Sequence, residues 1–161
     1  MLRTDEVRKE LAGLAVDQPA PAAFGAGIYT ERATARTYEE VLRRAAVALG
    51  TGETVVLDAS FTLATWREQA RVVAAETSSD LVELRCDAPP EVAAERIRRR
   101  AAAGQDPSDA TPEIAAALAA ATAPWPEATT IDTAGHPAAA LADALRHARV
   151  PASTQPGIYG A

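Results

Sequence analysis

Apolar residues in the first part of the chain recur at helical spacing in two stretches. The first stretch covers residues 5–14 and follows a short strand end at residues 2–3. The second covers residues 30–50 and carries a continuous apolar stripe up to its closing glycine. A stripe of this period is what an amphipathic helix presents to a core. Residues 15–30 are rich in Pro, Ala and Gly and predict a loop between the two helices.

Short apolar runs alternate with further helical stretches in the rest of the chain. Residues 55–57 read Val-Val-Leu, a continuous apolar run typical of a buried parallel strand. Two further strands are predicted at residues 81–86 and 128–132. Helical spacing predicts helices over residues 63–76, 89–104, 112–121 and 137–149. Strands and helices that alternate in this way predict an α/β domain with a parallel sheet.

Length and composition narrow the class of protein. The chain has 161 residues, of which 48% are hydrophobic and only 4% aromatic. We therefore expect one domain over residues 1–149, with an aliphatic core, and a loose tail over residues 150–161. The formal net charge of -6 makes nucleic acid and anionic membranes weak candidates as partners.

Three further observations bear on location and metal chemistry. Cys86 is the only cysteine, which excludes an internal disulfide and a cysteine-based zinc cluster. No apolar run approaches the roughly 20 residues of a membrane span. The first residues include acidic side chains and lack the apolar region of a secretory signal. We therefore expect a cytoplasmic protein without a membrane partner.

Asp5 and Arg8 form the first candidate pair for chemistry. Ligands of open α/β sheets bind beyond the carboxyl ends of the strands, and this pair directly follows the first strand at i, i+3 spacing. A carboxylate there can accept a proton from a substrate hydroxyl, and a guanidinium can clamp an anionic or polar group. The alternative is a helix-capping aspartate in a surface ion pair.

Asp58 is the second candidate, because it ends a purely apolar strand. Nucleotide enzymes commonly place a carboxylate at this position to hold Mg²⁺ or a water molecule. The alternative is a side chain that caps the helix that follows.

Arg96 and Arg100 are the third candidate group, at i, i+4 on one helix face. Two arginines on one face can neutralise charge on a phosphoryl group during transfer. The alternative is a solvated basic helix end, which the helix dipole favours. We prefer that alternative for Arg98 and Arg99.

Together these groups favour phosphoryl transfer, and the order of sequence blocks over residues 2–148 resembles small P-loop kinase-like ATPases. These proteins are commonly labelled AAA-family ATPases although they are kinases in architecture, and some are fused to an aminoglycoside-phosphotransferase-like domain. More distant relatives are 5′-hydroxyl polynucleotide kinases, zeta toxins and gluconate kinases. The matching blocks are LRTDEVRKEL, GIYTERATARTYEEVL, ETVVLDASF, TWREQA, APPEVAAERIRRR and DPSDAT. The resemblance implies a three-layer fold around a parallel sheet.

The resemblance also implies a role for each candidate residue. In such kinases a DxxR element supplies the substrate-side base and clamp, and the aspartate that ends the third strand lies on the Mg²⁺ side. An RxxxR pair on the lid stabilises the transition state, and a further arginine often lies near the substrate pocket. The matching residues here are Asp5 and Arg8, Asp58, Arg96 and Arg100, and Arg67. Ser108 and Asp109 match the turn beside the lid, without an assigned chemistry.

The phosphate-binding loop of this family, GxxxxGK[ST], does not occur in the sequence. In that loop backbone N–H groups cradle the phosphates, the lysine reaches them and the hydroxyl holds Mg²⁺. The chain has no Gly-Lys pair, and its only lysine, Lys9, lies inside the DxxR block. Gly25 and Gly27 do not complete a GxGxxG pattern, because position 30 is Thr30.

The strand that precedes the phosphate-binding loop in the family is absent from the sequence together with the loop. The resemblance implies the strand order 2-3-1-4-5, in which the strand before the loop is central. Without it, the strand that ends at Asp58 and the strand at residues 81–86 would each lose a neighbour, which favours association. Three explanations are open: a start placed too late, a fragment of a longer protein, or a real truncated product whose sheet closes differently. We favour the first two together, because Met1 falls within a family strand.

The expected function follows from the resemblance. We expect the intact form to be an ATP- and Mg²⁺-dependent phosphotransferase that acts on a hydroxyl of a small molecule or nucleotide. Its partners would be that acceptor and an upstream segment or fused domain. We expect this chain alone to bind ATP negligibly. The alternatives are a non-catalytic remnant or interaction module with the same fold, and an NTP hydrolase. Residues 15–30 should line the acceptor pocket, because such loops vary most.

Overall fold

The computed structural model describes residues 1–22, 25–103 and 106–148. The expected tail, the helix end near residue 104 and the final helix residue at position 149 lie outside these residues. None of the described helices is long and apolar enough to cross a bilayer.

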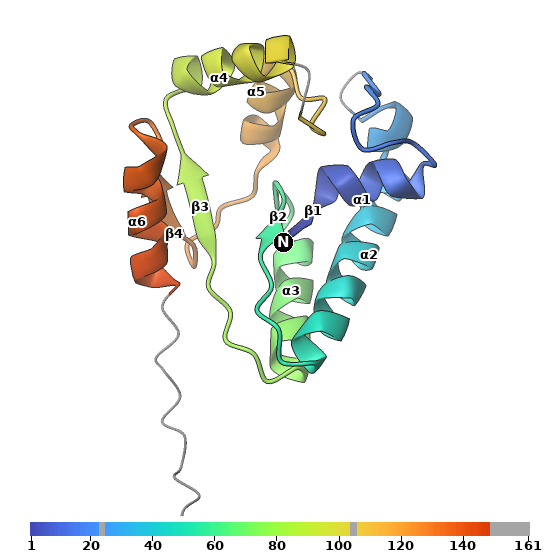
Figure 1. The fold of residues 1–161 in the computed structure, drawn as a ribbon, viewed down its shortest axis with the longest axis vertical. Helices are drawn as coiled ribbons and strands as arrows, with labels where there is room; N and C mark the ends of the chain where they lie inside the picture. The colour runs from blue at the N-terminus through green and yellow to red at the C-terminus, as the bar shows by residue number, and fades with distance from the viewer. Residues whose placement is uncertain (23–24, 104–105, 149–161) are drawn as a thin grey trace, which may run out of the picture.

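Strands and helices alternate along the described chain, which confirms the α/β class (Figure 1). The strands are β1 (Leu2–Arg3), β2 (Leu57–Asp58), β3 (Leu84–Asp87) and β4 (Thr129–Asp132). The helices are α1 (Thr4–Leu11), α2 (Glu31–Gly50), α3 (Ala64–Glu76), α4 (Pro90–Ala103), α5 (Pro112–Ala121) and α6 (Pro137–His147), and a 3-10 turn, η1, covers Gly27–Tyr29.

The helix starts follow local capping chemistry. The Thr30 side chain accepts a hydrogen bond from the Ala33 backbone N–H at the start of α2. Thr111 does the same for Ile114 at the start of α5. Such caps satisfy N–H groups that the helix itself leaves unpaired. For this reason the sequence placed these two starts within one residue.

The strands are shorter and lie later than the apolar runs predicted. The run at residues 55–57 yields only β2, which begins at its last residue, and the run at residues 81–86 yields β3 from Leu84. Val56 is 56% exposed and Val82 43% exposed. An apolar run becomes a paired strand only where a neighbouring strand takes up its backbone hydrogen bonds residue after residue. The Val56 carbonyl accepts one such bond, from the Leu2 N–H of β1, at the point where the pairing begins.

The strands form two separate parallel pairs instead of one sheet. In the first pair Leu2 lies opposite Leu57 and Arg3 opposite Asp58. In the second pair β3 lies beside β4 over four residue pairs. No described strand joins β2 to β3, and Figure 1 shows the two standing apart. These are the two strands for which the family resemblance implies a lost neighbour.

The main core lies where α2 and α3 pack beside β2. Its centre is aromatic: Tyr38 stacks on Trp66 with ring centroids 4.9 Å apart and meets Phe61 edge-on at 5.4 Å. Most other buried apolar residues are aliphatic, as expected. The sequence did not reveal that the few aromatic residues gather in one place.

Candidate functional site

A cavity of about 910 Å³ opens beyond the carboxyl ends of β1 and β2. Its walls come from α1, η1, α2, α3, α5, the segment between β2 and α3, and residues 108–110. Three of the predicted site residues line it, namely Asp5, Arg8 and Asp58. The structure therefore brings together residues that are more than fifty positions apart in the sequence.

Asp5 lies in the first turn of α1, two residues after Arg3, which pairs with Asp58. Burial raises the pKa of the Asp5 carboxyl above its ordinary value, while a hydrogen bond with Ser108 and the charge of Arg8 act in the opposite direction. The nearby charge of Asp58 raises the pKa further. A carboxylate whose pKa is raised is a stronger base once it is ionised, as a general base requires.

Asp58 ends β2 with its side chain 55% exposed. Arg3 Nε donates a hydrogen bond of 3.0 Å to Asp58 Oδ2. The capping alternative does not apply, because α3 begins at Ala64 with Leu63 at its cap. Asp58 is thus open toward the cavity, with one cationic partner. Arg3 was missed by the sequence reasoning, since only the strand register places it opposite Asp58.

Arg8 is buried and already engaged with the chain itself. Its Nη1 donates to the Ile28 carbonyl at 3.0 Å and to the Thr34 hydroxyl at 3.1 Å. The guanidinium also lies over the Tyr29 ring, 4.9 Å from its centroid. Arg8 is therefore neither half of a surface ion pair nor a free clamp. It fixes η1 and the start of α2 as one wall of the cavity.

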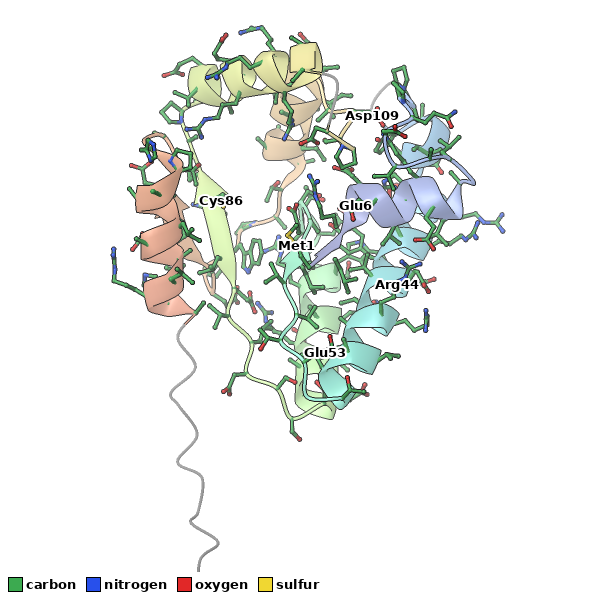
Figure 2. All side chains as sticks on the ribbon, in the orientation of Figure 1. Met1, Glu6, Arg44, Glu53, Cys86 and Asp109 are labelled. Atoms are coloured by element: carbon green, nitrogen blue, oxygen red, sulfur yellow. The ribbon has the colours of Figure 1, made fainter. Side chains whose placement is uncertain are left out.

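Asp109 connects residues 106–110 to the wall of the cavity that η1 forms (Figure 2). Its Oδ2 accepts a hydrogen bond of 2.8 Å from the Tyr29 hydroxyl and lies 3.4 Å from Lys9 Nζ. Its Oδ1 accepts from the Ala20 backbone N–H at 3.1 Å. The sequence showed this residue only as part of a polar turn, because its three partners come from distant positions.

The only lysine is part of this structural network. Lys9 is 1% exposed, and its Nζ also donates to the Val16 carbonyl at 3.3 Å. A lysine that holds nucleotide phosphates has to present its ammonium group to a ligand. Lys9 does not fit that role, and no residue in the described part of the chain supplies the phosphate-binding loop.

Arg67, for which the sequence analysis predicted a place near the substrate pocket, is not among the residues that line the cavity. It is 3% exposed and lies over the Trp125 ring, 4.7 Å from the centroid. Its N–H groups donate to four backbone carbonyls at 2.8–3.1 Å, those of Phe61, Thr62, Ala123 and Pro124. Arg67 therefore holds the chain together beneath the cavity, where carbonyl groups would otherwise be buried unpaired.

Arg96 and Arg100 share a face of α4 as predicted, together with Arg99, but do not line the main cavity. Arg96 Nη2 donates to the carbonyls of Ala134 and Gly135. Arg100 Nε lies 3.8 Å from Asp106 Oδ2. Both side chains are exposed, and an exposed ion pair such as that of Arg100 contributes little. The structure thus places them beside the site and not in it.

Asp58 is the cavity carboxylate that the sequence analysis predicts on the Mg²⁺ side. The described residues contain no group of three His, Cys, Asp or Glu side chains that could hold a metal ion. Mg²⁺ in nucleotide enzymes is bound by one or two carboxylates together with substrate phosphates. A single open carboxylate fits a cation that arrives with a nucleotide and does not fit a permanent metal centre.

Comparison with known proteins gives a consistent picture of the fold. A family model described as AAA domain matches residues 1–124. Two curated relatives, the uncharacterized proteins Rv2004c of Mycobacterium tuberculosis and Mb2027c of Mycobacterium bovis, are 42% identical over 135 residues, or 84% of this chain. The chain spans about a quarter of their length, at 26%.

A solved structure from Chloroflexus aurantiacus, named as a candidate kinase, has a TM-score of 0.62 to this chain. The match covers 92% of this chain and 83% of that one at 20% identity. At this identity the likeness shows the fold alone.

Proposed function

Because the chain belongs to the AAA-domain family and has a P-loop kinase-like fold, we propose that it is the acceptor-binding part of an ATP-dependent phosphotransferase. The acceptor is a hydroxyl group of a small molecule or nucleotide. One observation carries the proposal. Asp5 lies just after β1 and Asp58 ends the neighbouring parallel strand β2, and both residues line the same cavity. A cytoplasmic location fits such an enzyme and is part of the proposal.

Asp5 is the general base of this proposal. Its carboxylate would take the proton from the acceptor hydroxyl and so make that oxygen nucleophilic. The pKa of Asp5, which burial raises, suits this task. Arg8 acts indirectly, because its contacts with Ile28 and Thr34 shape the wall against which the acceptor rests.

Asp58 is the residue that would hold Mg²⁺. ATP with Mg²⁺, when bound, supplies the phosphoryl group. Arg96 and Arg100 stabilise negative charge in this proposal only if α4 moves over the cavity, as lids of such enzymes do. The exposed contact between Arg100 and Asp106 would oppose that motion weakly.

Acceptor-dependent ADP release by a longer polypeptide tests the proposal. The coding DNA is extended upstream until an in-frame GxxxxGK[ST] segment is included, and turnover is measured over a panel of alcohols. Asp5→Asn should lower kcat by about 10²–10⁴, the usual contribution of a general base. The matched control, Asp80→Asn, removes an exposed carboxylate outside the cavity and should leave kcat unchanged.

The outcomes separate the alternatives. Undiminished turnover by Asp5→Asn would contradict its role as base, and ADP release without any acceptor would favour an NTP hydrolase. A non-catalytic module is the second candidate, favoured by the burial of Lys9 and by the lack of a phosphate-binding loop among the described residues. A closed upstream reading frame would support it.

A further inference from the structure

The walls of the cavity are largely apolar and aromatic. Tyr29 and Tyr38 line it on the side of η1 and α2, and Trp66 lines it from α3. Aliphatic side chains complete it, contributed by Leu63, Ile114 and Leu118. Aromatic rings provide flat surfaces on which another ring can stack. Such walls favour a ligand with an apolar or ring-containing body over a chain of hydroxyl groups.

The charged groups of the cavity do not favour an anionic ligand. Four carboxylates line it, those of Asp5, Glu31, Asp58 and Asp109, against two arginines. Arg3 already contacts Asp58, Glu6 and Asp106. Arg8 is committed to Ile28 and Thr34, as described above. A phosphate or carboxylate on the acceptor would therefore meet excess negative charge without a free cation among the described lining residues.

We propose that the acceptor is an uncharged alcohol with an apolar or aromatic body, and not a nucleotide or another alcohol that carries phosphate or carboxylate. The inference rests on the proposed function and narrows its acceptor. Two observations support it together: the apolar and aromatic walls, and the engagement of both lining arginines.

Binding of matched probe pairs to the 161-residue chain tests the inference. 1-Phenylpropan-2-ol and 3-phenyllactate share a ring and a secondary hydroxyl, and they differ only in a methyl group against a carboxylate. Adenosine and adenosine 5′-monophosphate form the second pair. Dissociation constants come from ligand-observed NMR titrations. We expect the uncharged member of each pair to bind at least about tenfold more tightly, which corresponds to about 1.4 kcal/mol.

Leu63 offers a site for matched variants, because it lines the cavity yet is 51% exposed, so that its replacement spares the core. Leu63→Gln should weaken binding of 1-phenylpropan-2-ol about fivefold, whereas Leu141→Gln, on exposed α6, should not change it. Leu63→Arg introduces a free cation and should shift the preference toward 3-phenyllactate. Circular dichroism establishes that each variant is folded.

Equal or tighter binding of the anionic members would overturn the inference, and so would the absence of binding by every probe to the folded chain. The test involves neither ATP nor phosphoryl transfer. Failure of turnover in the longer polypeptide would therefore count against the proposed function alone, and failure here would count against the acceptor class alone.

Discussion

At the scale of single residues, burial decides which charged groups serve the fold and which face the cavity. Lys9 and Arg67 are almost fully buried and bind parts of their own chain. Asp58 remains open beside Arg3. Asp5 is intermediate, since it is buried enough to shift its pKa yet lines the cavity. The sequence identified Asp5 and Asp58, because a carboxylate after an apolar strand has a recognisable position.

The raised pKa of Asp5 predicts a stability cost that depends on pH. The pKa of Asp5 in the folded state lies above its value in the unfolded state, which is near 3.8, so the folded state binds the proton more tightly. Stability therefore falls as the pH rises from the unfolded pKa through the folded pKa. Asp5→Asn should therefore raise the melting temperature at pH 7. Its advantage should vanish as the pH falls below 3.8, where both states are protonated. Thermal unfolding across pH, with Asp80→Asn as control, measures this. A destabilised Asp5→Asn at pH 7 would refute it.

The contact between Lys9 and Asp109 predicts that removal of the Asp109 carboxylate lowers stability. This loss should be larger than the gain expected from Asp5→Asn. Asp109→Ala would leave Lys9 buried without its carboxylate partner and remove the bonds from Tyr29 and Ala20. Loss of one partner of a buried ion pair costs about 3–5 kcal/mol in free energy of unfolding. Urea denaturation measures the change, and Asp80→Ala, which removes an exposed carboxylate, serves as control. A loss similar to that of the control would mean that the pair contributes no stability.

At the scale of elements, α3 connects the two parts of the structure through Arg67. The segment between β2 and α3 includes Phe61 with φ of +43°, a left-handed conformation that is rare for residues other than glycine. Tyr38 and Arg67 hold this residue through its N–H and its carbonyl. Arg67 also binds the carbonyls of Ala123 and Pro124 after α5. The sequence showed an arginine on a helix and could not show that its partners are backbone carbonyls.

Arg67→Lys tests this connection while keeping the charge. A lysine ammonium cannot reproduce the planar arrangement of N–H groups that meets four carbonyls. At least one buried carbonyl would lose its partner, and we expect a loss of about 2 kcal/mol or more in free energy of unfolding. Arg85→Lys, at an exposed position on β3, is the matched control and should have little effect. Equal stability of the two variants would argue against the proposed connection.

At the scale of the whole molecule, two strand pairs are held together without a shared sheet. β1 and β2 lie with α1, α2 and α3, and β3 and β4 lie with α6 (Figure 1). Besides Arg67, the connections include hydrogen bonds from Arg71 on α3 to Glu83, just before β3. The facing edges of β2 and β3 are unpaired among the described strands, and exposed valines lie next to them. Open edges of this kind recruit further strands.

The 161-residue chain should therefore self-associate in solution. Light scattering after size-exclusion chromatography should give a mass above the 16.8 kDa monomer, increasing with concentration. Val56→Lys and Val82→Lys place charges beside the open edges and should shift the mass toward the monomer. Val47→Lys, at an exposed position on α2, is the control and should leave association unchanged. A strictly monomeric parent chain would contradict the prediction.

The sequence by itself determined the element order, the α/β class, the family resemblance and the position of two carboxylates. These features depend on local spacing, capping and chain order, which the sequence contains directly. Only the tertiary structure decided what each basic residue contacts. Lys9 and Arg67 bind other parts of their own chain. Arg8 stabilises one wall of the cavity, and Arg3 pairs with Asp58. The reason is that burial and hydrogen-bond partners depend on segments far apart in the chain, which only packing brings into contact.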